Sequence, residues 1–316
     1  MPNREFRPTL SQLRSFVTVA EQKHFGSAAA KLGISQPSLS QGLAALEEGL
    51  GVQLIERSTR KVIVTATGEA LLPDAKAAIH AAEALVVRAR GAADPFAGPL
   101  TLGIIPTIAP YLLPHLLPLI AEEFPQTELQ VVEEKTERLL AKLRDGLIDV
   151  ALLALPADTP GLEEIPLYTE PFAAVMPKDH PLAGKRDLSL DQLGQLELLL
   201  LDDGHCLRDQ VIDLCKAAGV ANTANAHAVA RASSLTTVVQ LVVAGMGATL
   251  LPVSALAAEC YRPNLAVARF AQDSGAGREV GVVFRTASIR KEHFAELGSI
   301  IKRAYESAVD SWPEYE

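Results

Sequence analysis

Two of the three cysteines in the chain lie nine residues apart, in the segment DDGHCLRDQVIDLC, residues 202–215. Gly204 is typical of a strand-to-helix turn, so we expect Cys206 in the first turn of a helix, with His205 beside it and Arg208 two residues on. The unpaired amides of a helix N-terminus favour a thiolate, and a nearby cation favours it further. Because the thiolate is the form that attacks a peroxide, Cys206 is a candidate reactive thiol.

Cys215 cannot meet Cys206 while both belong to one continuous helix. Nine residues of helix advance about 13.5 Å and leave the two side chains on nearly opposite faces. A disulfide needs Cα atoms about 5.5 Å apart, so one formed here would unwind the helix and change the shape of its domain. The alternative is that Cys215 is a small buried residue and Cys206 a chance surface thiol. Cys260, in AAECYRP, matches no motif and we expect it to be structural.

The amino-acid composition indicates in which compartment these thiols lie and whether they bind a metal. Three cysteines in 316 residues are too few for a disulfide framework, and a reducing compartment would keep them as thiols at rest. No histidine pair lies beside them at zinc-ligand spacing, so we expect neither a metal nor another cofactor. The N-terminus lacks the apolar core of a secretory signal, and no apolar run reaches the eighteen or so residues of a membrane span. These features predict a cytoplasmic protein with no membrane partner.

The charge of the chain is uneven. Its net charge is −9, but residues 1–70 hold eight Lys and Arg against six Asp and Glu, a balance of +2, which leaves −11 on the remainder. This asymmetry is compatible with a small nucleic-acid-facing head on a large acidic body.

The first 66 residues have the pattern of a helix-turn-helix followed by a wing. Apolar spacing predicts a helix to about residue 20, a second helix FGSAAAKL stopped by Gly33, and a third from Ser35 to Gly49, with Ser35 as its cap and Pro37 in its first turn. The following QLIERSTRKVIVT predicts a short hairpin.

A long helix should follow from Thr67 to about residue 91. A heptad seam favours pairing with a second copy, although a helix packed on its own domain has the same pattern. The seam comprises Leu71, Ala75, Ala78, Ala82, Leu85 and Ala89, flanked by Leu72, Ile79 and Val86. Pro73 should kink this helix or delay its regular start.

The segment GAADPFAGP marks a hinge at residues 92–99 before an α/β body at 100–316. We expect helices near 109–124, 136–146, 206–219, 233–244 and 289–309. Predicted strands are LTLGII, ELQVVEE, DVALLAL, AAVMP, LELLL, AHAVA, GATLLP and VGVVF. Such alternation predicts a largely parallel sheet in two subdomains, 100–168 with 271–316, and 169–270.

The N-terminal segment resembles the DNA-binding domain of LysR-type transcriptional regulators. It contains the SQPxxS pattern at 35–40, LGxxLxxR at 50–57, and a threonine and glycine that lead into the long helix. The resemblance extends to that linker helix and to a two-subdomain effector domain similar to periplasmic binding proteins. It implies a winged helix-turn-helix on double-stranded promoter DNA, a homodimer through the linker helix, a homotetramer through the bodies, and RNA polymerase as a further partner.

On this resemblance the third helix would enter the major groove and the wing would hold the phosphate backbone. The DNA-binding residues would be Ser35, Gln36, Pro37, Ser38, Ser40 and Gln41 on the helix, and Arg57, Arg60 and Lys61 on the wing.

The segment GHCLRDQ, with a second cysteine nine residues after the first, closely resembles the peroxide-sensing members of that family. This implies that Cys206 is the peroxidatic thiol and Cys215 the resolving thiol. The resemblance also implies a hydrogen peroxide site, made of Thr107, Thr136, His205, Gln210 and Arg278. Without the resemblance, the two threonines would be interpreted as plain helix caps.

Three alternative functions are compatible with the same predicted helices and strands. The first is a LysR-type regulator of a small organic ligand, with idle cysteines. The second is a thiol peroxidase or disulfide reductase, which the absence of CxxC and the DNA-binding head disfavour; we expect no enzyme. The third is a periplasmic solute-binding protein, which the missing signal peptide disfavours.

Overall fold

The computed structural model describes residues 6–57, 62–89, 96–220, 232–288 and 290–312. It divides into two compact units, the first formed by the described residues before 94 and the second by nearly all of those after. Each unit has its own apolar core, and each is described on its own.

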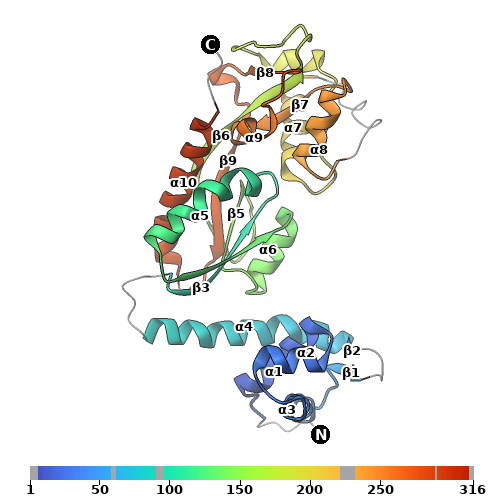
Figure 1. The fold of residues 1–316 in the computed structure, drawn as a ribbon, viewed down its shortest axis with the longest axis vertical. Helices are drawn as coiled ribbons and strands as arrows, with labels where there is room; N and C mark the ends of the chain where they lie inside the picture. The colour runs from blue at the N-terminus through green and yellow to red at the C-terminus, as the bar shows by residue number, and fades with distance from the viewer. Residues whose placement is uncertain (1–5, 58–61, 90–95, 221–231, 289, 313–316) are drawn as a thin grey trace. The chain divides into compact units, whose positions relative to one another are not determined.

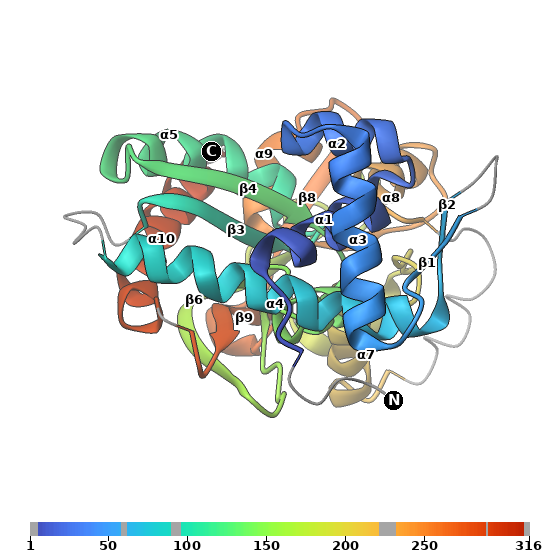
Figure 2. The same ribbon diagram turned by 90° about the horizontal axis from the view of Figure 1, so that it is seen from below.

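The first unit is a three-helix domain with a two-stranded wing, which can be followed in Figure 2. Its elements are α1 (Leu10–Gln22), α2 (Phe25–Leu32), α3 (Gln36–Leu50), β1 (Ile55–Arg57), β2 (Val62–Val64) and α4 (Ala66–Ala89). Gly33 ends α2 with a φ of 65°, and the Ser35 hydroxyl accepts a hydrogen bond from the Ser38 amide at 3.3 Å to cap α3. The predicted helix-turn-helix and wing are confirmed.

Helix α4 begins at Ala66 and contains Pro73, so of the two expected effects of this proline, the delayed start does not occur. Its first turns pack on the core of the same unit, where Ala75 is buried and Leu71 makes apolar contacts. Farther along, Leu85 and Val86 are 68% and 47% exposed. The heptad seam is therefore divided: its N-terminal part packs within the domain, and its C-terminal part presents apolar side chains outward.

The second unit is built on a seven-stranded sheet of order β4-β3-β5-β9-β6-β7, with β8 also paired to β6. The strands are β3 (Gly98–Ile104), β4 (Thr127–Glu133), β5 (Val150–Leu155), β6 (Leu162–Pro177), β7 (Thr249–Pro252), β8 (Leu265–Arg269) and β9 (Gly277–Arg285). Strand β3 is parallel to β4 and β5, whereas the pairs of β9 with β5 and of β6 with β7, β8 and β9 are antiparallel. The expectation of a largely parallel sheet is therefore wrong for the described strands.

Two long strands explain this mixed topology. Strand β6 pairs with β9 over Leu162–Pro171 and then with β7 and β8 over Phe172–Pro177, so one continuous strand serves both halves of the unit. Figure 1 shows β6 and β9 running side by side between those halves. The predicted subdomain boundary at 168/169 falls inside β6.

Helices cover the sheet and enclose two apolar cores. The main helices are α5 (Ala109–Glu123), α6 (Thr136–Arg144), α7 (Cys206–Ala217), α8 (Leu235–Val243) and α10 (Phe294–Asp310), with a short α9 (Leu256–Glu259). One core gathers around β3, β5, β9 and α10, and the other around β6, β7, α7 and α8. None of the described helices has the length and apolar character needed to cross a membrane.

Some predicted strands differ from the structure. The run LELLL is not a strand among the described residues: Leu198 forms a single bridge with Ala248, and Leu201, the residue after the run, forms one with Ala232. Strand β6 starts at Leu162, well before AAVMP, and β8 was not predicted. The predicted strand AHAVA lies outside the described residues.

Candidate thiol site and DNA-binding face

Cys206 is the first residue of α7, as its position after Gly204 predicted. His205 is the N-cap in extended conformation and makes no side-chain capping bond, while Gly204 has a φ of 87°. Cys206 is half-buried and packs against the core around β3, although α7 packs mainly in the other core. The thiol thus lies where the two halves of the second unit meet, at the positive end of a helix.

A small pocket opens onto this thiol. Three segments line it: Ile105–Thr107 after β3, Lys135 and Thr136 after β4, and Gly204–Cys206 before α7. The first two follow the carboxyl ends of parallel strands, where α/β sheets bind their ligands. The pocket has no space for a water-sized molecule in this structure, so an occupant would have to displace lining side chains.

Several buried polar atoms around the thiol lack a hydrogen-bond partner among the described residues. They are Thr136 Oγ1, His205 Nε2 and Gln210 Oε1, with Asp202 Oδ1 nearby in the chain. An unpaired buried polar atom costs about 1–3 kcal/mol. Because Thr136 and His205 line the pocket itself, their unpaired atoms mark a place for a small hydrogen-bonding ligand.

Arg278, in β9, provides a buried positive charge at the same place. Its Nε and Nη2 contact Glu170 Oε2 at 2.8 and 2.6 Å, and its Nη1 donates to Thr107 Oγ1 at 2.7 Å. Burial lowers the pKa of Arg278, but the Glu170 carboxylate and the Cys206 sulfur more than compensate and raise it above its ordinary value. A permanently charged guanidinium therefore lies within electrostatic range of the thiol.

The structure changes the expected source of positive charge near Cys206. Burial, followed by the charge of Lys135, lowers the pKa of His205, so its imidazole is neutral near pH 7. Arg208 pairs with Asp203 at 2.8 Å. The sequence suggested these two neighbours, but the fully buried cation is Arg278, 72 residues further along the chain.

The two other cysteines lie in different surroundings. Cys215 is fully buried in the core around α7, and this burial raises its pKa. Cys206 and Cys215 are both free and share the continuous helix α7, so nine residues of helix separate them. Burial and then Glu259 raise the pKa of Cys260 to about 12, which makes it a poor nucleophile.

The structure brings together most of the predicted peroxide-site residues. Thr107, Thr136, His205 and Cys206 line one pocket, and Arg278 reaches it through Thr107. Gln210 lies one turn further along α7 and does not line the pocket.

Sequence reasoning missed two residues at this site. Lys135 lines the pocket and donates from Nζ to the Asp203 carbonyl at 2.7 Å; its position at the end of β4, beside Thr136, was the available signal. Glu170 is the buried partner of Arg278, and the single charge within YTEPFAAVMP marked it.

The predicted DNA-binding residues of α3 lie together on its first turns. Ser35, Gln36, Pro37, Ser38 and Gln41 are exposed, Ser40 is half-buried, and the opposite side of the helix is buried. Arg57 ends β1, while Arg60 and Lys61 lie outside the described residues. The exposed amide and hydroxyl groups of α3 are of the kind that reads base edges in a major groove.

The fold and these two sites are those of a DNA-binding regulator with a separate α/β body. Residues 10–69 match the bacterial regulatory helix-turn-helix protein of the lysR family, and residues 93–305 match the LysR substrate binding domain. The chain belongs to the LysR family of transcriptional regulators.

Relatives within this family are similar over nearly the whole chain. The chain is 51% identical over 302 residues to a probable hydrogen peroxide-inducible genes activator of Mycobacterium avium. The alignment covers 95% of this chain and 96% of that protein. Among solved structures, a cysteine-to-serine variant of OxyR from Corynebacterium glutamicum, with H2O2 bound, has 58% identity and a TM-score of 0.70, covering 98% of this chain and 96% of the other. A full-length cysteine-to-aspartate OxyR variant from Pseudomonas aeruginosa has 36% identity and a TM-score of 0.77, covering 94% and 98%.

Proposed function

We propose that the chain is a hydrogen-peroxide-responsive transcriptional regulator that is switched by oxidation of Cys206. The observation that carries this proposal is the convergence on one thiol of a helix N-terminus, unpaired buried polar atoms and the charged Arg278. Relatives named for hydrogen peroxide induction, and a related structure with H2O2 bound, support it.

The first chemical step oxidises the Cys206 sulfur. Hydrogen peroxide would occupy the pocket with Thr136 Oγ1 and His205 Nε2 as hydrogen-bond partners and Thr107 beside it. The thiolate attacks one peroxide oxygen, so the S–O bond forms as the O–O bond breaks. The second oxygen leaves as hydroxide and takes a proton to become water. Arg278 stabilises the negative charge that moves from sulfur to the departing oxygen.

The second step forms a disulfide with Cys215. Its thiol sulfur displaces hydroxide from the Cys206 sulfenic acid, and with the thiol proton this leaves as a second water. Since helix α7 holds the two sulfurs apart, the step requires α7 to unwind. The reduced and oxidised bodies then differ in shape, and DNA binding reports that difference.

Peptide-mapping mass spectrometry after brief exposure to stoichiometric peroxide tests this chemistry. We expect a fast, selective Cys206–Cys215 disulfide, while Cys260 stays reduced as an internal control. Cys206→Ser should abolish the response and keep DNA binding. Slow oxidation of all three thiols would overturn the proposal and favour the other candidate, a LysR-type regulator of a small organic ligand.

We further propose that the cytoplasmic chain acts on double-stranded promoter DNA as a homodimer through α4 and a homotetramer through its bodies, with RNA polymerase as a partner. It would consume peroxide stoichiometrically and is proposed not to be an enzyme. The exposed start of α3 and the outward Leu85 and Val86 support the DNA and dimer assignments.

The wing provides the test of the DNA assignment. Arg57→Glu with Lys61→Glu should weaken binding to every DNA sequence and flatten the dependence of affinity on salt, because two phosphate contacts are lost. Unchanged affinity and salt slope would show that the wing does not contact DNA.

A further inference from the structure

The thiol pocket has one long, flexible side chain among the described residues that line it, that of Lys135. This lysine follows β4, whereas Gly204–Cys206 reach the pocket from the start of α7. Its Nζ donates to the Asp203 carbonyl at 2.7 Å, in the turn that leads into α7. The side chain of Lys135 therefore connects the loop after β4 with the loop before α7, both of which line the pocket.

The stem of Lys135 passes close to the backbone of Gly204. A Cβ on Gly204 would lie 3.2 Å from Lys135 Cδ and 3.7 Å from its Nζ, so the absence of a side chain on this glycine leaves room for the lysine. Lys135 is half-buried. Asp203, whose carbonyl accepts its hydrogen bond, also pairs through its carboxylate with Arg208 of α7 at 2.8 Å. The lysine is thus packed along the pocket and bonded to a turn that α7 holds in place.

An occupant of the pocket must displace a lining side chain, because the pocket has no space for a water-sized molecule. Ile105, Thr107 and His205 are only 1%, 2% and 4% exposed, and moving any of them would disturb a close-packed core. Lys135 differs from them because its ammonium group can exchange the Asp203 carbonyl for water while its stem stays on the protein surface. Lys135 is therefore the lining residue that can open the pocket at the lowest cost.

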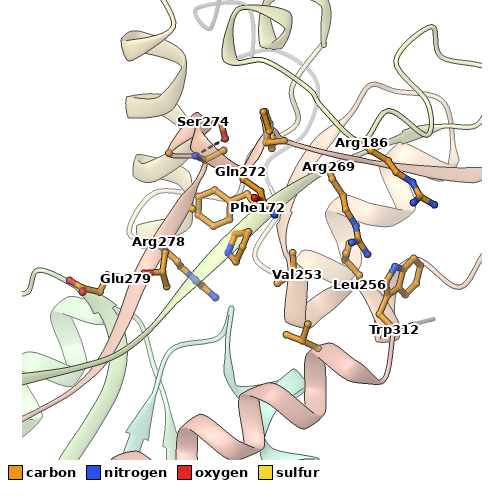
Figure 3. Close-up of a pocket in the computed structure, with 18 of the residues that line it drawn as sticks. Phe172, Arg186, Val253, Leu256, Arg269, Gln272, Ser274, Arg278, Glu279 and Trp312 are labelled. Carbon is orange, nitrogen blue, oxygen red and sulfur yellow. Dashed lines mark hydrogen bonds between the residues drawn. The ribbon is translucent and has the colours of Figure 1, made fainter. Parts of the chain in front are cut away.

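The narrowness of the thiol pocket is a local property of the second unit. A larger cavity of about 960 Å³ lies beside β6 and α10, with Phe172, Val253 and Leu256 among its lining residues (Figure 3). Arg278 also lines this cavity, but Cys206 is not one of the described residues around it. Room for an organic molecule in this body thus lies away from the thiol, and access to Cys206 depends on its own small pocket.

We propose that Lys135 is a strap over the Cys206 pocket that admits hydrogen peroxide and excludes bulky organic hydroperoxides. The inference rests on the proposed peroxide chemistry and names the residue that selects the substrate. Hydrogen peroxide is little larger than water, so a small displacement of the lysine stem admits it and the hydrogen bond to Asp203 can form again. A branched alkyl hydroperoxide needs the space that the stem occupies, and the strap cannot close over it.

An organic hydroperoxide that reached the thiol would react in the same way at sulfur. The Cys206 thiolate attacks the terminal oxygen, the S–O bond forms as the O–O bond breaks, and the alkoxide takes a proton and leaves as an alcohol. The product is the same sulfenic acid that hydrogen peroxide gives. The ratio of the two oxidation rates therefore measures access to the pocket, because a change in thiolate reactivity alters both rates alike.

Lys135→Ala tests the strap, with hydrogen peroxide and tert-butyl hydroperoxide as the two probes. In the reduced full-length protein, we expect Cys206 to be oxidised much faster by hydrogen peroxide, as measured by quenched peptide mapping. Lys135→Ala should lower the ratio of the two rates by about tenfold or more, since the larger probe gains entry. Lys135→Arg keeps a long stem and a donor and should retain the ratio. The matched control is Lys142→Ala: Lys142 lies on α6, bonds to Glu134 at 3.3 Å and is not among the described residues that line the pocket.

A second readout measures access to Cys206 without peroxide. The small reagent methyl methanethiosulfonate and the bulkier N-phenylmaleimide both modify thiols, and peptide mapping reports the rate of each at Cys206 alone. Lys135→Ala should raise the rate of the bulkier reagent relative to the small one by about tenfold, whereas Lys135→Arg and Lys142→Ala should leave this ratio unchanged. Circular dichroism checks that each variant is folded.

If wild-type Cys206 reacts rapidly with hydrogen peroxide, the strap is overturned by a rate ratio of the two peroxides that Lys135→Ala leaves unchanged or that Lys142→Ala lowers equally. If wild-type Cys206 resists hydrogen peroxide, the proposed function fails, and the two thiol reagents then decide on the strap. A shift toward the bulkier reagent in Lys135→Ala supports the strap, and an unchanged ratio overturns it.

Discussion

At the scale of single residues, the thiol site depends on atoms that the folded chain leaves unpaired. Thr136 Oγ1 and His205 Nε2 are buried and find no hydrogen-bond partner in the described part of the chain, which costs stability that a structural role alone would not explain. Arg278 adds a charge that is kept in place by Glu170 and Thr107. Binding and chemistry can therefore be separated from folding by conservative substitutions.

Thr136→Val is expected to leave the free energy of unfolding unchanged or slightly raised, because it removes a buried hydroxyl without a partner. It should slow Cys206 oxidation by about tenfold, the equivalent of one lost hydrogen bond of about 1.4 kcal/mol. Thr249→Val is the control: Thr249 Oγ1 donates to the Leu199 carbonyl at 2.9 Å, away from the thiol. It should cost about 1 kcal/mol of stability and leave the oxidation rate intact. Urea unfolding and stopped-flow peroxide kinetics measure the two quantities. Equal effects of both variants on the rate would contradict the role of Thr136.

The lowered pKa of His205 predicts a loss of stability in mild acid. In the unfolded chain histidine titrates near pH 6.5, whereas in the folded chain burial and Lys135 disfavour the proton. The contribution is thus fully present above about pH 6.5 and is lost as pH falls through the lower folded value. His205→Asn should flatten the dependence of the unfolding free energy on pH between about 7 and 5, measured by urea denaturation. An unaltered slope in this variant would show that His205 does not carry the effect.

At the scale of elements, helix α7 carries both cysteines but holds them too far apart to form a disulfide. Its first turn presents Cys206 to the small pocket, while its regular turns keep Cys215 buried on the far side. The helix that carries both cysteines must therefore unwind before the disulfide can form.

Hydrogen exchange should detect the unwinding of α7. Peroxide-treated protein is expected to exchange amides of residues 206–217 faster than reduced protein, because the disulfide breaks helical hydrogen bonds. In Cys215→Ser, oxidation stops at the sulfenic acid and α7 should stay protected. Exchange in α6 provides the internal reference. Retained protection of α7 in the disulfide form would mean that the sulfurs meet by another movement.

At the scale of the whole molecule, assembly is expected to depend on the outer part of α4. Leu85→Glu with Val86→Glu places two charges on side chains that are already exposed, so the domain should fold while the dimer weakens. Analytical ultracentrifugation should show the average mass falling toward the monomer. Ile63→Glu, on the wing and 48% exposed, is the matched control and should leave the mass unchanged. An unchanged mass in the α4 variant would place the dimer contact elsewhere.

Local patterns in the sequence determined much of this protein. Cap residues, glycine stops and apolar spacing gave the helix-turn-helix, the wing and α7 with Cys206 at its start, because these features act over a few residues. The motifs around residues 35–57 and 204–215 indicated the family and the candidate thiols. Thr107 and Thr136 were indicated only by the resemblance to that family, and the structure places both after the carboxyl ends of parallel strands.

Only the tertiary structure decided what depends on distant partners. The sheet is mixed because β6 pairs with strands in both halves of the unit. No local run of residues indicates that pairing. LELLL has the composition of a strand but forms only a single bridge among the described residues, since strand pairing depends on a second segment. The division of the α4 seam and the neutral state of His205 likewise depend on packing. So does the ion pair of Arg278 with Glu170, 108 residues away, because burial and Coulomb interactions follow distance in space and not separation along the chain.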